Sequence, residues 1–155
     1  MVEIDPGITE VAREFFFLKD NPRLKIFHED ARVYLNKNTV KYDVIYGDAF
    51  TSWFSVPYQL TTREAIQKQY DSLSEDGIVI INIVSSLKGE TSEFFRSEYF
   101  TFKDIFPQVY IFPTANKNDP KLMQNIILIA LKSPKIPSFT SDDSTLTSLL
   151  SDIWT

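Results

Sequence analysis

Cysteine is absent from the 155-residue chain, and histidine occurs only once, as His28. Without cysteine the chain can form neither a disulfide framework nor a thiolate nucleophile, and a zinc site built from His and Cys side chains is excluded. A Ser-His-Asp triad would depend entirely on His28, which adjoins Glu29 and Asp30 at a predicted strand end, where we expect a surface or capping role. The lack of cysteine is typical of a reducing compartment, so we expect a cytoplasmic protein.

Positive charge is also scarce, because 16 Lys and Arg residues stand against 21 Asp and Glu residues, for a net charge of -5. A protein that neutralises phosphates needs clustered basic residues, and here they are scattered, so we expect no nucleic-acid partner. No segment approaches the roughly 18 consecutive apolar residues that cross a bilayer, and we expect no membrane association for this chain. The aromatic content of 14%, with 13 Phe, is typical of a packed core.

Strand-like and helix-like segments alternate along the chain. Helical spacing of apolar residues predicts helices that begin near Ile8, near Asp30 and near Phe95, and a short helix within residues 146–153. A further helix is predicted from the capping box at residues 61–64, with Gly77 as its stop. Apolar stretches bounded by turn residues predict strands over residues 2–5, 24–27, 42–46, 78–84, 109–112 and 126–131.

This alternation predicts an α/β fold, namely a Rossmann-like, three-layer α/β/α arrangement whose six-stranded sheet is mostly parallel and has helices on both faces. Strand 126–131 is expected to be antiparallel to its neighbours, because the loop that joins it to strand 109–112 is too short for a helical crossover. The predicted domain spans residues 1–133. Residues 134–155 form a polar C-terminal tail with the short helix.

Acidic residues stand where three of the predicted strands end: Glu3 or Asp5, then Asp30, then Asp48. Ligands of open α/β sheets bind at the carboxyl ends of the strands, so the acids at this common edge predict a single site. The alternative for Asp5 and Asp30 is that each is a helix N-cap, which is the usual role of Asp at a strand-helix junction. Both interpretations stay open at this point.

Several short motifs resemble a known family when they are taken together in order and spacing. They indicate the polyamine aminopropyltransferase (spermidine synthase-like) branch of the class I S-adenosylmethionine-dependent methyltransferase fold. Within that branch the chain is most similar to the spermidine synthase-like methyltransferases. The motifs are Val-Glu-Ile-Asp-Pro at residues 2–6, Asp-Ala-Arg-Val-Tyr-Leu at 30–35, Tyr-Asp-Val-Ile-Tyr-Gly-Asp-Ala-Phe at 42–50, Pro-Tyr-Gln-Leu-Thr-Thr-Arg-Glu at 57–64 and Asp-Gly-Ile-Val at 76–79.

The resemblance implies a site for S-adenosylmethionine or decarboxylated S-adenosylmethionine. Glu3 would bind the ribose hydroxyls, because a carboxylate can accept two hydrogen bonds from a vicinal diol. Asp30 would accept a hydrogen bond from the exocyclic amine of adenine, and the Ala31 N–H would meet a ring nitrogen. Ile4 would lie against the adenine face, with an ordinary core position as the equal alternative.

The resemblance also implies where the chemistry would take place. Asp48 matches the catalytic carboxylate that holds or deprotonates an amine nucleophile. Pro57 and Leu60 would wall the adenine pocket, or serve as turn and packing residues. We therefore expect transfer of a methyl or aminopropyl group to a small amine-like acceptor, with a homodimer as one option for assembly.

Two departures from the family pattern bear on this expectation. Thr51 stands where aminopropyltransferases carry a second acid that grips a cationic polyamine. The Gly-rich first strand is missing as well: its turn would lie about 20 residues before Glu3, and the strand itself sits between strands 2–5 and 42–46 in the family.

Three explanations of the missing strand stay open. The chain is a fragment of a longer enzyme, which we favour; or it is complemented by another chain; or it has re-paired its strands into a non-catalytic α/β binding or interaction module. If the chain folds as given, we expect strand 2–5 to pair with strand 42–46 or with a partner molecule.

Overall fold

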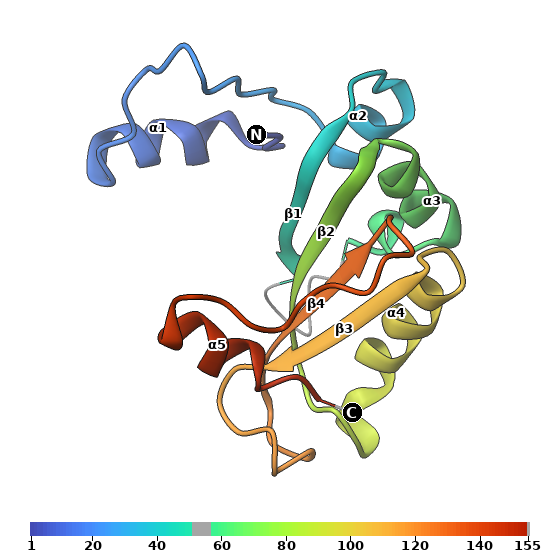
Figure 1. Cartoon of the computed structure of the whole chain (residues 1–155). Coiled ribbons are helices and arrows are strands. Elements are labelled where there is room, and N and C mark those ends of the chain that lie inside the picture. The colour runs from blue at the N-terminus through green and yellow to red at the C-terminus, as the bar shows by residue number, and fades with distance from the viewer. Residues whose placement is uncertain (51–56, 155) are drawn as a thin grey trace. The chain divides into compact units, whose positions relative to one another are not determined.

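The computed structural model describes residues 1–50, apart from the Phe50 side chain, and residues 57–154. The chain divides into two compact units, Met1–Thr39 and Val40–Thr155 (Figure 1). Each unit has its own local strand pairing and packing.

The first unit contains two short helices and a single bridge between extended segments. Helix α1 spans Pro6–Phe15, with Pro at its start and Asp5 as its N-cap, and α2 spans Ala31–Lys37. A parallel bridge joins Val2 to Phe27. The predicted strands 2–5 and 24–27 were wrong as strands, because one isolated bridge is all the regular pairing that the described residues of this unit provide, and a strand requires a ladder of such pairs.

The second unit is built on a four-stranded sheet. The strands are β1 (Tyr42–Phe50), β2 (Leu73–Ser85), β3 (Gln108–Pro113) and β4 (Gln124–Leu131), in the order β1-β2-β4-β3. The strands β1 and β2 are parallel, while β4 is antiparallel to both β2 and β3. The predicted antiparallel strand is thus confirmed, and the other three strands share one direction.

Strand β1 lies at one edge of this sheet. Its neighbour in the sheet is β2, and Val44 and Tyr46 on β1 are both more than half exposed. We expected strand 2–5 to pair with residues 42–46 or with a partner molecule, and the first of these pairings was wrong, since Val2 pairs with Phe27. Within the described residues, the four-stranded sheet has no strand paired with the far edge of β1.

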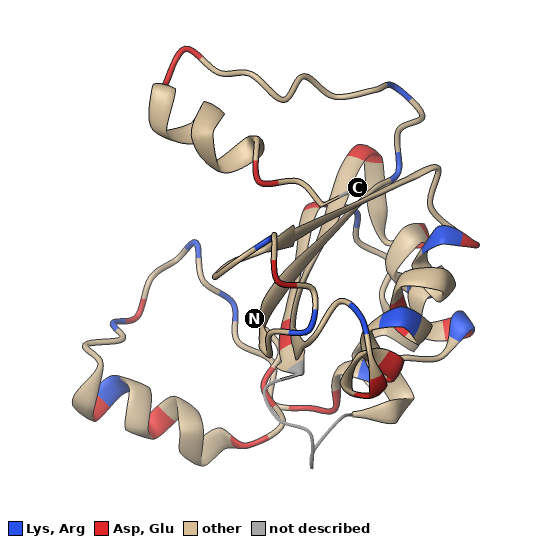
Figure 2. Ribbon diagram, turned by 90° about the horizontal axis from the view of Figure 1, so that it is seen from below, with Lys and Arg blue, Asp and Glu red and all other residues tan. Residues whose placement is uncertain are grey.

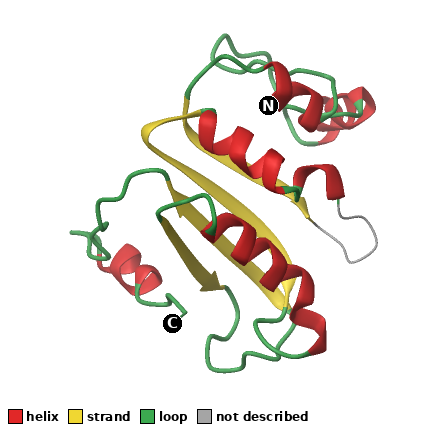
Figure 3. Ribbon diagram, turned by 90° about the vertical axis from the view of Figure 1, so that its right-hand side faces the viewer, coloured by secondary structure: helices red, strands yellow, loops and turns green. Residues whose placement is uncertain are grey.

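Two helices pack side by side on one face of this sheet. Helix α3 (Arg63–Asp71) follows the 3-10 turn η1 (Tyr58–Leu60), and α4 (Glu93–Lys103) follows the 3-10 turn η2 (Glu90–Ser92) (Figure 3). Helix α5 (Ser144–Leu150) lies on the other side of the sheet, near β3, and buries none of its residues (Figure 1). Helices therefore lie on both sides of the sheet, as expected for a Rossmann-like α/β fold.

Alternation along β2 places the core under α3 and α4. Val79, Ile81 and Ile83 are buried, whereas the residues between them are only partly covered, because successive side chains of a strand point to opposite faces. The buried cluster also draws on α3, α4, β3, β4 and the loop after α4, through Ile66, Phe95, Phe102, Phe106, Ile111, Ile126 and Leu128. Helices α3 and α4 carry charged residues of both signs, while the strands carry few (Figure 2).

The end of α3 differs from the prediction. Thr62 caps the helix as expected, and its hydroxyl accepts a hydrogen bond from the Ala65 N–H at 3.2 Å. The helix ends at Asp71, however, and Gly77 lies within β2. A Cβ atom on Gly77 would lie 2.9 Å from the Tyr42 carbonyl oxygen, so the glycine permits the close approach of β1 and does not stop a helix.

Within the described residues, no helix is both long enough and apolar enough to cross a bilayer.

Candidate active site

Asp48 lies near the carboxyl end of β1, where its carboxylate is held by a neighbour on β2. The Asn82 side-chain Nδ2 donates a hydrogen bond to Asp48 Oδ1 at 2.9 Å. The two side chains come from adjacent parallel strands and lie on the face of the sheet opposite α3 and α4, because Asn82 falls between the buried Ile81 and Ile83. In the described parts of the chain, no Lys or Arg pairs with Asp48. Asp48 is thus an oriented carboxylate, exposed to solvent, that can accept a further hydrogen bond.

Asn82 is a site residue that the sequence reasoning did not single out. Its Oδ1 is buried and has no hydrogen-bond partner in the described part of the chain, although its Nδ2 is engaged by Asp48. A buried acceptor without a partner is costly, so core packing alone does not explain an asparagine at this position. The sequence pattern that could have identified it is simple: Asn82 is the one polar residue within the apolar segment 78–84.

The first unit brings Glu3 and Asp30 to a common edge. Val2 and Phe27 pair in parallel, and the Glu3 N–H donates to the Phe27 carbonyl at 3.0 Å. Glu3 and Asp30 both follow these bridged segments, so they lie at the same end of the parallel bridge, and their role as ligands stays a prediction. The Glu3 Oε1 accepts a hydrogen bond from the Asp5 N–H at 2.9 Å, which orients the carboxylate.

The N-cap interpretation holds for both Asp5 and Asp30. The Asp5 Oδ1 accepts from the Gly7 N–H at 2.8 Å, and the Asp30 Oδ1 accepts from the N–H groups of Arg32 and Val33 at 2.8 and 3.0 Å. In each carboxylate the cap uses Oδ1, so capping by itself does not exclude a ligand role. The ligand role of Asp30 therefore stays a prediction.

The remaining residues predicted to contact adenine have different surroundings. Ile4 is 67% exposed, so an ordinary core position does not describe it. Ala31 is the first residue of α2 and is half-buried. Pro57 precedes η1 and its carbonyl accepts from the Leu60 N–H at 2.7 Å, while Leu60 packs against the core. The turn and packing alternative therefore describes Pro57 and Leu60, and their contact with adenine stays a prediction.

The predicted site residues fall into two groups. Glu3, Ile4, Asp30 and Ala31 belong to Met1–Thr39, whereas Asp48, Pro57 and Leu60 belong to Val40–Thr155. Hydrogen bonds join Asp48 to Asn82 and Leu60 to Pro57, and none between the described residues joins these two pairs to each other. Thr51, the position of the second acid in aminopropyltransferases, lies outside the described residues.

Two other titratable groups lie away from these acids. His28 Nε2 is 3.0 Å from the hydroxyl of the buried Thr9, which ties α1 to the segment after Phe27 and gives His28 a structural role. Burial raises the pKa of Glu98 on α4 from 4.5 to about 8, because the charged carboxylate loses its hydration. Among the residues that the structure describes, no three acidic or histidine side chains converge to hold a metal ion.

The chain matches known proteins over most of its length. Residues 1–142 match the spermine/spermidine synthase domain. The polyamine aminopropyltransferase of Vibrio vulnificus is 28% identical over 130 residues, which cover 82% of this chain and 42% of that protein. The corresponding enzyme of Streptococcus uberis is 33% identical over 116 residues, which cover 72% of this chain and 40% of that protein. The chain thus spans less than half the length of these relatives.

Solved structures support the same fold. A probable spermidine synthase from Corynebacterium glutamicum superimposes with a TM-score of 0.75 at 23% identity, over 99% of this chain and 55% of that chain. Human methyltransferase-like protein 13, in complex with SAH, gives a TM-score of 0.75 at 24% identity, over 97% of this chain and 68% of that chain. The match over residues 1–142 shows that this chain belongs to the spermine/spermidine synthase family.

Proposed function

We propose that this chain supplies the acidic part of an aminopropyl-transfer site, which moves the group from decarboxylated S-adenosylmethionine to an amine of the polyamine type. The observation that carries the proposal is the Asp48–Asn82 pair: an exposed carboxylate, oriented by an amide and not neutralised by a cation in the described residues, at the carboxyl end of a parallel strand. A carboxylate in that position suits a cationic or neutral amine. The polyamine aminopropyltransferases to which the chain is similar are named for acceptors of this type.

In this proposal Asp48 holds the acceptor amine and takes its proton. When bound, the nucleoside supplies an electrophilic carbon beside a cationic sulfur, so no acid is needed to assist the leaving group. The protein has to orient the amine nitrogen and remove its proton as the new C–N bond forms. Asn82 would keep Asp48 in one rotamer through Nδ2, and its buried Oδ1 would accept a second N–H of the amine.

The first unit has donor and acceptor groups that fit an adenine nucleoside. The Glu3 carboxylate is fixed by the Asp5 N–H at the end of an extended segment, and its remaining lone pairs suit the two ribose hydroxyls. Asp30 and the N–H of Ala31 lie at the start of α2, at the same edge of the parallel bridge. We propose that Glu3 and Asp30 bind the nucleoside, with Ile4 against adenine. In the second unit, contact of Pro57 and Leu60 with adenine stays a prediction.

We further propose that a Gly-rich strand completes the site by pairing with the open edge of β1. That edge belongs to a parallel pair, and parallel strands in α/β folds are normally paired on both sides. The relatives are more than twice as long as the part that matches, which leaves ample sequence in them for such a strand. The chain of 155 residues would then bind the nucleoside only weakly by itself.

Calorimetric titration and product analysis together test these proposals. The chain is compared with a version that carries a β-strand and a Gly-rich turn fused ahead of Met1, each titrated with decarboxylated S-adenosylmethionine. The fused version should bind and should release methylthioadenosine when putrescine is added. Tight binding by the unfused chain, or no binding by either version, would contradict the proposed completion of the site.

Methyl transfer is the second candidate, and Thr51 favours it, because a single acid grips a polyamine less well than a pair. The two reactions leave different products. Aminopropyl transfer from decarboxylated S-adenosylmethionine leaves methylthioadenosine, whereas methyl transfer from S-adenosylmethionine leaves S-adenosylhomocysteine. Chromatography of the reaction mixture with each donor therefore decides between them.

A further inference from the structure

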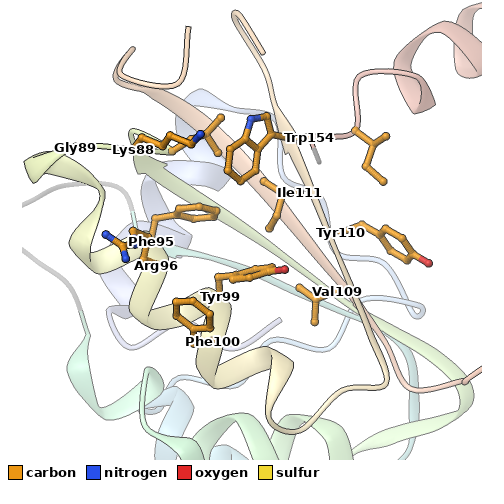
Figure 4. Close-up of a pocket in the computed structure, with 12 residues that line it drawn as sticks. Lys88, Gly89, Phe95, Arg96, Tyr99, Phe100, Val109, Tyr110, Ile111 and Trp154 are labelled. Atoms are coloured by element: carbon orange, nitrogen blue, oxygen red, sulfur yellow. The ribbon is translucent and has the colours of Figure 1, made fainter. Parts of the chain in front are cut away.

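A cavity of about 650 Å³ lies in the second unit, between the start of α4, the outer strand β3 and the C-terminal segment. Figure 4 shows Phe95 and Tyr99 of α4 along one side, with Trp154 and Lys88 along the other. The cavity is at the β3 edge of the sheet, whereas Asp48 lies on β1 at the opposite edge. It is therefore separate from the proposed transfer site.

The aromatic walls of the cavity are held in place by ring stacking on α4 and by a backbone hydrogen bond to β3. The Phe95 and Tyr99 rings stack with centroids 6.3 Å apart and an interplanar angle of 30°. On the other side, the Trp154 backbone N–H donates to the Ile111 carbonyl at 2.8 Å, which fixes the C-terminal segment beside β3. Two aromatic walls of this kind can enclose a flat apolar group, since aromatic rings pack well by stacking.

Among the described residues that line the cavity, the charged ones are Lys88 and Arg96, and both are basic. Lys88 Nζ lies 5.7 Å from the centre of the Trp154 ring, and Arg96 lines the edge beside Phe95 (Figure 4). Neither cation forms an ion pair in the described parts of the chain, and none of the lining residues is acidic. In a chain with a net charge of -5, two unpaired cations at one cavity indicate an anionic ligand.

The backbone also leaves room at the mouth of the cavity. Gly89 lies between Lys88 and η2 with a positive φ of 92°, and a Cβ atom there would meet no atom within 4 Å. The Lys88 backbone N–H donates to the Pro120 carbonyl at 2.8 Å, so the loop that carries the lysine is anchored. The lysine side chain itself is exposed and can turn toward a ligand.

From this geometry we propose that the cavity binds a small molecule with a flat apolar body and an anionic head group, either a carboxylate or a phosphate. The body lies between Trp154 and the Phe95–Tyr99 pair, and the head group meets Lys88 and Arg96. This ligand is opposite in charge to an amine acceptor, so the proposal is independent of the transfer reaction.

A matched set of naphthalene compounds tests the proposal by ligand-observed NMR and calorimetry on the whole chain. 2-Naphthoate and 2-naphthyl phosphate carry the two anionic heads, 2-naphthylmethylamine is the cationic counterpart and 2-naphthalenemethanol the neutral one. At least one anion should bind saturably with a dissociation constant below about 1 mM. It should bind about tenfold more tightly than the amine or the alcohol. The tighter of the two anions identifies the head group.

Substitutions then locate the site. Lys88→Gln combined with Arg96→Gln should remove most of the preference for the anion, and Trp154→Ala should weaken all four compounds. Lys68→Gln, an exposed lysine on α3, is the matched control and should change nothing. Circular dichroism melts show whether each variant is folded. Equal binding of the four compounds, no saturable binding, or an anion preference that survives the double substitution would overturn the proposal.

Discussion

The units Met1–Thr39 and Val40–Thr155 differ in the interactions that stabilise their folded structure. Every buried hydrophobic residue of the described chain belongs to the second unit, whereas the buried residue of the first is Thr9. The first unit relies on helix caps and one parallel bridge, but the second has three strand ladders and a core under two helices. Apolar burial is the main driving force of folding, so stability should reside in the second unit. Both units nevertheless carry proposed site residues.

The largest test of this difference is to remove a core side chain. Phe102 on α4 is 1% exposed and packs against Phe106. Phe102→Ala should lower the free energy of unfolding by about 3–5 kcal/mol, because it leaves a cavity in the core. Phe100→Ala, on the same helix but 58% exposed, should change it by less than about 0.5 kcal/mol. Urea denaturation measures both. A comparable loss of unfolding free energy from Phe15→Ala on α1 would contradict the conclusion that stability resides in the second unit.

The second test uses pH and the buried carboxyl group of Glu98. Its pKa is raised to about 8 in the fold, against an ordinary value of 4.5. Between these values the folded chain keeps a proton that the unfolded chain releases, so the free energy of unfolding should fall as pH rises. The slope is at most about 1.4 kcal/mol per pH unit, and it vanishes above the folded pKa.

Glu98→Gln keeps the shape of the side chain and removes its titration. Denaturation curves at pH values between 4.5 and 8 should then lose this slope, and the variant should be more stable than the wild type at the upper end. Glu93→Gln, in the exposed first turn of α4, should keep the wild-type slope. If the wild type and Glu98→Gln respond to pH alike, the buried acid is not protonated in the folded chain.

The third test separates the proposed roles of the acids in the two units. In a version that binds the nucleoside, Glu3→Gln should weaken binding by about 1–3 kcal/mol, since it removes a charged hydrogen bond. Asp48→Asn should instead lower turnover and leave nucleoside affinity nearly unchanged. Calorimetry and initial rates measure the two effects, with Glu10→Gln on α1 as the control. An unchanged affinity in Glu3→Gln would remove the nucleoside role from the first unit.

The smallest test compares one helix cap from each unit. Thr62→Ala removes the cap of α3, which packs on the core, and should lower the free energy of unfolding by about 1 kcal/mol. Asp5→Ala removes the cap of α1 and should reduce helical circular dichroism without moving the main unfolding transition. Equal shifts of that transition would mean that the two units unfold together.

Local patterns in the sequence were sufficient for most of the elements. Asp30, Thr62 and Asp143 cap α2, α3 and α5, and apolar spacing located α1 and α4. Gly77 misled the prediction of where α3 ends, because glycine serves both as a helix stop and as the residue that allows two strands to approach closely. The sequence alone does not distinguish these two roles of glycine, because the second depends on which strand lies beside it.

The sequence alone determined the helix starts and the direction of β4, because each depends on residues close together in the chain. It also indicated the family, through the order and spacing of several short motifs. The tertiary structure decided which segments gain a full ladder of hydrogen bonds. Segments 2–5 and 24–27 have the residue types of strands, yet a strand also needs a series of backbone hydrogen bonds to a neighbouring strand. In the described chain these segments share only the Val2–Phe27 bridge. Contacts across a long stretch of sequence were likewise beyond local patterns. The pairing of Asp48 with Asn82, 34 residues away, depends on the register of two strands, and the burial of Glu98 depends on how α4 packs.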